Sequence, residues 1–133
     1  MNKDIRFKQR FENLQRSYQL LKHAVDTEQS SDIERAGLIQ FFEMTFELSW
    51  KTLKDYLESQ GFDVKTPKET FKQSFQMGII EDGHTWMEAL EDRNLMTHTY
   101  DEPMCLKVVG LIKNKYYPCI SALYQALLTK ASS

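Results

Sequence analysis

Residues 3–26, KDIRFKQRFENLQRSYQLLKHAVD, carry the clearest structural signal in the chain. Apolar side chains recur there at intervals of four and three residues, which places them on one face of an α-helix. They are Phe7, Phe11, Leu14, Tyr18, Leu21 and Val25. The spacing predicts a helix over most of residues 3–26, with one long apolar stripe that must pack against other helices.

The next two helices are marked by their ends. A polar loop over residues 26–31 leads into a second helix, from about Asp32 to Gln60, which either Asp32 or Ser31 can cap. Gly61 then suits the position just past its end. A short third helix is predicted after the capping-box sequence of residues 66–69, TPKE, and Gly78 ends it.

Two more helices complete the chain. The fourth is predicted over about residues 84–97. The fifth begins near Asp101 and carries apolar residues to about residue 127. Pro118 lies inside it and is expected to kink it, because proline cannot donate the helical hydrogen bond.

Few glycines and prolines interrupt these patterns, five and three respectively, which favours long helices joined by short connections. The prediction is therefore an all-α fold, an up-and-down four-helix bundle with one additional short helix. Residues 1–133 are expected to form a single domain, because no internal repeat or linker is visible.

Composition argues against two classes of protein, those that coat nucleic acid and those that span a membrane. The net charge of −2 argues against a protein that coats nucleic acid by electrostatics alone, although a local basic cleft stays possible. No apolar run approaches the roughly 20 residues needed to span a bilayer, and the N-terminal residues lack an apolar signal segment. A cytoplasmic protein without membrane association is expected.

Cysteine and histidine spacing gives no sign of a metal or cofactor site. Cys105 and Cys119 lie fourteen residues apart in one predicted helix. At about 1.5 Å per residue they would be roughly 21 Å apart, too far for a disulfide. No cluster has metal-ligand spacing, so neither a metal nor a cofactor is predicted.

The functional hypothesis centres on residues 93–100, RNLMTHTY, which we call the octet. Arg93 offers a planar fork that suits a phosphate, and His98 titrates near neutral pH, so it can take or give a proton. Asn94 can orient His98 or the substrate, and Tyr100 can present its hydroxyl in the same cleft. Such groups favour phosphodiester chemistry without a metal.

A helical wheel predicts which face of the fourth helix each residue of the octet occupies. Arg93 falls on the apolar stripe of the predicted fourth helix, where a buried or semi-buried arginine needs a partner. Asn94 and His98, four residues apart, share a neighbouring face. The competing interpretation is that this Arg and His are surface or structural groups near a helix end.

Polar residues of the second predicted helix can line the same cleft. Glu43, Glu47 and Lys51 follow one another at intervals of four, with Trp50 beside them. One interpretation is a polar wall that pairs with Arg93 or contacts a nucleotide. The other is a solvated face stabilised by a Glu–Lys pair.

The octet resembles the R-x4-H-x-Y motif of HepT-type HEPN proteins, through Arg93, His98 and Tyr100. Chain length, helical order and the place of the motif before the last long helix also match. One branch of these proteins is labelled nucleotidyltransferase substrate-binding.

The resemblance implies a metal-independent endoribonuclease toxin that acts as a homodimer on RNA, with both motif copies facing one composite cleft. His98 would activate the ribose 2′-hydroxyl or protonate the leaving oxygen. Arg93 would bind the scissile phosphate, and Asn94 would support His98. The implied partner is a minimal nucleotidyltransferase antitoxin, which transfers AMP onto Tyr100 as a switch.

Two alternatives remain open at this point. The chain could be a non-catalytic subunit that binds nucleotide or another substrate for a nucleotidyltransferase. It could also be a purely structural helical dimer.

Overall fold

A computed structural model describes residues 2–93, 96 and 101–133, and within them all regular structure is helical. The elements are, in chain order, α1 (Lys3–Asp26), α2 (Asp32–Ser59), α3 (Pro67–Gln76), α4 (Gly83–Asp92), α5 (Glu102–Leu111), η2 (Ile112–Tyr116) and α6 (Tyr117–Ala131). The predicted all-α fold is confirmed.

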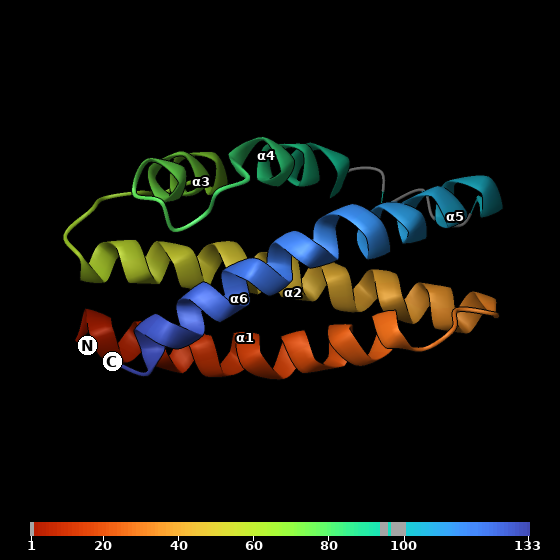
Figure 1. Ribbon diagram of the computed structural model, residues 1–133, viewed down its shortest axis with the longest axis horizontal. Coiled ribbons are helices and arrows are strands. Elements are labelled where there is room, and N and C mark those ends of the chain that lie inside the picture. The colour runs from red at the N-terminus through yellow and green to blue at the C-terminus, as the bar shows by residue number, and fades with distance from the viewer. Residues whose placement is uncertain (1, 94–95, 97–100) are drawn as a thin grey trace.

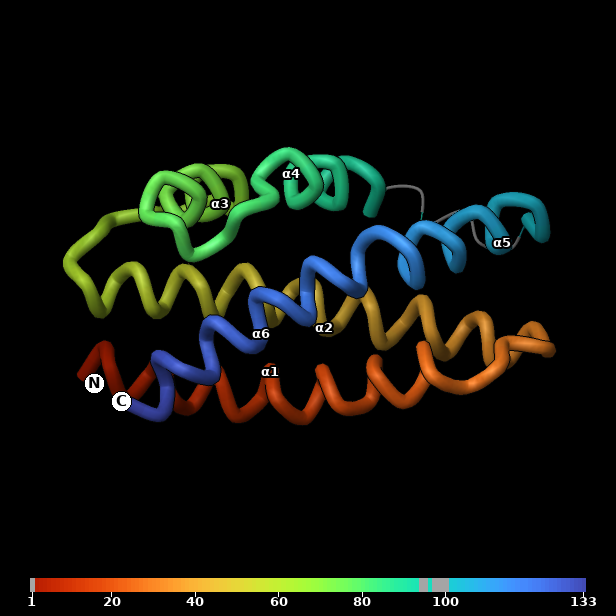
Figure 2. Tube along the Cα trace, viewed as in Figure 1, coloured from red at the N-terminus to blue at the C-terminus, as the bar shows by residue number. Residues whose placement is uncertain are grey.

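The long helices run side by side, and the short ones cover them. α1 and α2 form an antiparallel pair, and α6 crosses this pair (Figure 1). α3 and α4 follow one another along the side of α2 that faces away from α1 (Figure 1). The two termini lie at the same end of the bundle (Figure 2), where Lys8 Nζ donates to the Ser133 carbonyl over 3.5 Å. The path therefore returns to its starting point, as an up-and-down bundle requires.

The starts of α2 and α3 follow the capping chemistry predicted from the sequence, whereas Asp82 and Asp101, at the starts of α4 and α5, make no capping hydrogen bond with their side chains. Ser31, rather than Asp32, caps α2, and its Oγ accepts the Glu34 backbone N–H over 3.1 Å. Thr66 caps α3 in the same way, accepting from the Glu69 N–H over 3.1 Å. Gly61 follows α2 with a φ of 91°, a left-handed conformation that glycine adopts without strain.

The apolar stripe of α1 is the base of the core. Its predicted members are buried except Val25, which is partly exposed. Aromatic rings link the layers. Phe46 of α2 lies 6.0 Å from Phe71 of α3 and 5.9 Å from Trp86 of α4, measured between ring centroids. These contacts fix α3 and α4 on α2, and with them the site described below.

The predicted fifth helix is not one regular helix. A π-helical stretch, η2, separates α5 from α6, and Pro118 falls in the first turn of α6. The wider π turn lies where the proline ring would otherwise meet the carbonyl four residues earlier. The predicted disturbance at Pro118 is thus present, as a π turn before the proline.

None of the helices formed by the described residues combines the length and the apolar character needed to cross a membrane.

Two isoleucines of α2 test the core assignment with the same substitution. Ile39 is 4% exposed and Ile33 is 84% exposed. Replacing a buried isoleucine with alanine loses packing and leaves a cavity, so Ile39→Ala should lower the free energy of unfolding by about 2–5 kcal/mol. Ile33→Ala should change it by only about 0.5 kcal/mol or less. Urea unfolding followed by circular dichroism measures both, and equal effects would contradict this packing.

Candidate functional site

Arg93 stands at the C-terminal end of α4. The α-helix was predicted to continue to about residue 97, but it ends at Asp92, and Arg93 is the cap. Arg93 and Met96 then adopt the tighter 3₁₀ geometry, and Met96 is only 5% exposed. Met96 thus belongs to the hydrophobic core.

The other octet residues with predicted roles lie outside the described part of the chain. These are Asn94, His98 and Tyr100. Of the predicted catalytic residues Arg93, Asn94 and His98, the structure describes Arg93.

Arg93 reaches from α4 to α2. Its Nη1 donates to Glu47 Oε1 over 2.8 Å, and the two side chains are 40% and 44% exposed. The arginine is thus half-buried, within the buried or semi-buried range expected from its place on the apolar stripe. This contact is the one expected by the interpretation in which polar residues of α2 pair with Arg93.

Glu47 organises the polar side chains around it. Its second oxygen, Oε2, accepts the Trp50 indole N–H over 2.9 Å. Lys51 Nζ lies 4.0 Å from the same oxygen, a long and exposed ion pair of small energetic value. Of the two interpretations of this face, the geometry favours a polar wall that fixes Arg93 over a solvated Glu–Lys pair.

A hollow of about 270 Å³ opens beside the ion pair. Phe42, Glu43, Phe46, Glu47 and Arg93 line it. Glu43 as a whole is exposed, but partial loss of hydration at its carboxyl raises its pKa above the ordinary value. Of the predicted cleft residues of α2, Glu43 and Glu47 line the hollow with Arg93, around an apolar floor of two phenylalanines. Trp50 and Lys51 contact Glu47 but do not line the hollow.

The charges define what this hollow can bind. Glu47 neutralises the charge of Arg93, and Glu43 adds a second carboxylate. An anion therefore binds well only if it replaces Glu47 as the partner of the Arg93 guanidinium. A phosphate can do so, because two of its oxygens match the guanidinium fork. The half-exposed position allows this exchange with less desolvation than a buried ion pair would require.

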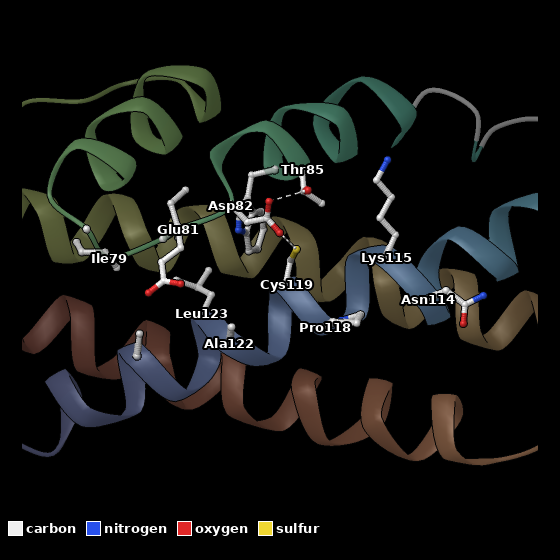
Figure 3. A pocket seen from close by; sticks show the side chains of 14 residues that line it. Ile79, Glu81, Asp82, Thr85, Asn114, Lys115, Pro118, Cys119, Ala122 and Leu123 are labelled. Carbon is white, nitrogen blue, oxygen red and sulfur yellow. Dashed lines mark hydrogen bonds between the residues drawn. The ribbon is translucent and has the colours of Figure 1, made fainter.

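A larger groove, of about 720 Å³, lies between the connection from α3 to α4 and helix α6 (Figure 3). Asp82 lies in one wall of this groove. Its carboxylate accepts hydrogen bonds from the Thr85 hydroxyl over 2.9 Å and from the Cys119 thiol over 3.2 Å. Burial and the neighbouring Asp82 carboxylate raise the pKa of Cys119 to about 12. This thiol is protonated at neutral pH and is not an activated nucleophile.

Sequence reasoning missed two residues near Arg93. Tyr116 of η2 donates its hydroxyl hydrogen to Asp92 Oδ2, at the last residue of α4. A signal was present, since a carboxylate at the C-terminal end of a helix opposes the helix dipole and calls for a partner. Its partner could not be identified without the tertiary structure.

Cys105 and Cys119 are both free thiols. Among residues 2–93, 96 and 101–133, no group of three or more potential ligands is placed to hold a metal ion.

Comparison with known families gives one match over most of the chain. Residues 9–129 match the family described as nucleotidyltransferase substrate binding protein like. The chain belongs to this family. The resemblance drawn from the octet is therefore confirmed at the level of the family.

A curated relative in this group is the probable ribonuclease HepT of Haemophilus influenzae. It is 30% identical over 82 residues, which are 58% of this chain and 56% of the relative. The chain thus matches little more than half the length of that protein.

Two solved structures share the fold of this family member. A Thermus thermophilus protein matches with a TM-score of 0.75 and 28% identity, over 90% of this chain and 99% of its own. The Haemophilus influenzae protein HI0074 matches with a TM-score of 0.74 and 25% identity, over 89% and 98%. HI0074 is described as having the fold of a substrate binding domain of a nucleotidyltransferase.

Proposed function

We propose that this protein is a metal-independent endoribonuclease toxin, paired with a minimal nucleotidyltransferase antitoxin and active as a homodimer. The observation that carries the proposal is Arg93. The first residue of the R-x4-H-x-Y motif stands at the rim of a hollow, held by Glu47 in an exposed ion pair that a phosphate can replace. The relationship to a probable ribonuclease HepT supports the same conclusion.

The chemistry requires a base, an acid and a cation. His98 of one copy takes the proton of a ribose 2′-hydroxyl, and the 2′-oxygen attacks the neighbouring phosphorus. The bond from phosphorus to the 5′-oxygen breaks, and the leaving oxygen receives a proton from His98 of the second copy. Arg93 binds the phosphate and stabilises the charge that develops on it, while Asn94 orients His98.

The homodimer follows from this division of roles. Each chain has one octet, and a base and an acid on opposite sides of the phosphorus require two histidines. A composite cleft with both octets supplies them. Glu43 and Glu47 of α2 line the hollow and set its walls, and Trp50 and Lys51 contact Glu47.

Cleavage of RNA by the purified protein in EDTA tests the proposal. The wild type should cut single-stranded RNA, and His98→Ala should lower the rate by about a hundredfold or more, since it loses acid–base catalysis. Arg93→Ala should show a similar loss. Gel analysis of end-labelled RNA measures the rates.

His84→Ala is the matched control, because His84 is 88% exposed and lies outside the octet. It should leave the rate unchanged. Equal rates for wild type and His98→Ala, or no cleavage by unmodified wild type, would contradict the proposal.

Tyr100 is the proposed switch. A minimal nucleotidyltransferase partner would bring ATP, and the Tyr100 phenol oxygen would lose its proton, attack the α-phosphorus and release pyrophosphate. AMP on Tyr100 adds bulk and negative charge beside Arg93, where the RNA phosphate must bind.

Co-expression with this nucleotidyltransferase should raise the intact mass of the protein by one AMP and abolish RNA cleavage. Mass spectrometry with peptide mapping measures this. Tyr100→Phe should stay unmodified, whereas Tyr117→Phe should be modified like the wild type. Modification at another residue, or none, would remove Tyr100 from this role.

A non-catalytic subunit that binds substrate for a nucleotidyltransferase is the second candidate. The family description and the description of HI0074 favour it. A protein that co-purifies with the nucleotidyltransferase, cuts no RNA and does not inhibit growth when expressed alone would fit this function.

A further inference from the structure

The π-helical element η2 directs two consecutive side chains at α4. Lys115 Nζ forms an ion pair with Glu88, and the Tyr116 hydroxyl donates to Asp92. Figure 3 shows Lys115 pointing from this element toward α4. Because Glu88 and Asp92 are four residues apart, they share one face of α4, and η2 holds that face at two successive turns.

Asp92 is poorly placed for the stability of α4 alone. It is the last residue of the helix, where the helix dipole disfavours a carboxylate, and the last turn contains no basic residue. Tyr116 has the complementary problem, since its side chain is 1% exposed and a buried hydroxyl needs a partner. Their hydrogen bond satisfies both groups.

The same tyrosine contacts the opposite wall of the hollow. Its ring stacks on Phe42 of α2, with 5.9 Å between centroids, and Phe42 lines the hollow together with Arg93. Burial and the Asp92 carboxylate raise the pKa of Tyr116 well above its ordinary value, so the hydroxyl remains a donor. Tyr116 therefore joins the wall of the site to the residue that directly precedes Arg93.

We propose that Tyr116 is a positioning residue of the site. Its hydroxyl holds the end of α4 through Asp92, so that Arg93 reaches Glu47 and the hollow. The inference rests on the proposed function for its kinetic consequence, but the positioning itself can be measured without RNA. A catalytic cation that shifts by about 1 Å can lose roughly a hundredfold in rate.

Tyr116→Phe removes the hydroxyl and keeps the ring. The matched control is Tyr124→Phe, because Tyr124 is also buried, at 4% exposure, and its hydroxyl accepts a hydrogen bond from Gln15 Nε2 over 3.0 Å. Asp92→Ala is a second variant, which removes the acceptor without changing the buried ring. Thermal unfolding of each variant shows that the comparison is made on folded protein.

The positioning is read from the Trp50 indole, which donates to Glu47, the partner of Arg93. The chain has two tryptophans, so a ¹H–¹⁵N spectrum shows two indole signals, and Trp50→Phe identifies the one from Trp50. Tyr116→Phe and Asp92→Ala should both move the Trp50 signal by more than its linewidth. Tyr124→Phe should leave it in place.

In RNA cleavage, Tyr116→Phe should lower kcat by about tenfold or more with little change in KM, whereas Tyr124→Phe should retain kcat. An unmoved Trp50 signal in both Tyr116→Phe and Asp92→Ala would overturn the inference, as would equal effects of Tyr116→Phe and Tyr124→Phe on kcat. If the wild type cuts no RNA, the proposed function fails, and the Trp50 signal still decides whether Tyr116 positions Arg93.

Discussion

The packing of α2 is the constraint on which the rest of this structure depends. This helix contacts α1, α3, α5 and α6, so most of its circumference is committed to the core. Phe42, Phe46 and Leu53 are each at most 2% exposed as a result. The polar strip that remains carries Glu43 and Glu47, and it faces the end of α4. The site therefore lies on the polar side of the central helix, directly over the buried residues Phe42 and Phe46.

The charges of this polar strip determine which anions can bind to Arg93. A guanidinium that already has a carboxylate partner does not attract every anion, because a ligand must compensate for the lost ion pair. Glu47 thus holds Arg93 in a defined position and competes with phosphate for it. A phosphate group can compensate through its two contacts with the guanidinium, and an oligonucleotide adds further contacts that a single phosphate ion lacks. Because the ion pair of Arg93 with Glu47 is exposed, binding of the proposed RNA substrate should be sensitive to salt.

Much of the fold followed from short-range rules. The four- and three-residue spacing in α1, the caps at Ser31 and Thr66 and the glycine after α2 are local features, and the sequence contains them. The link between Arg93 and a carboxylate of α2 could also be anticipated, because a charge on an apolar stripe needs a partner. The end of α4 at Asp92 could not be, since the predicted helical spacing continues beyond it and the tertiary structure was needed to locate the end. For the same reason, the contact of Tyr116 with Asp92 required the tertiary structure: the π turn that aims Tyr116 has no clear local signature.

The central claim is that Arg93 leaves Glu47 for an RNA phosphate. It is tested most directly by titrating the protein with an RNA oligonucleotide whose 2′-hydroxyls are methylated, so that it binds but is not cut. The ¹H–¹⁵N signals of the Arg93 Nε–Hε group and the Trp50 indole should move together and saturate, and Arg93→Gln should abolish the response of Trp50. Binding of the oligonucleotide with both signals unmoved, or no binding at low salt, would contradict the account.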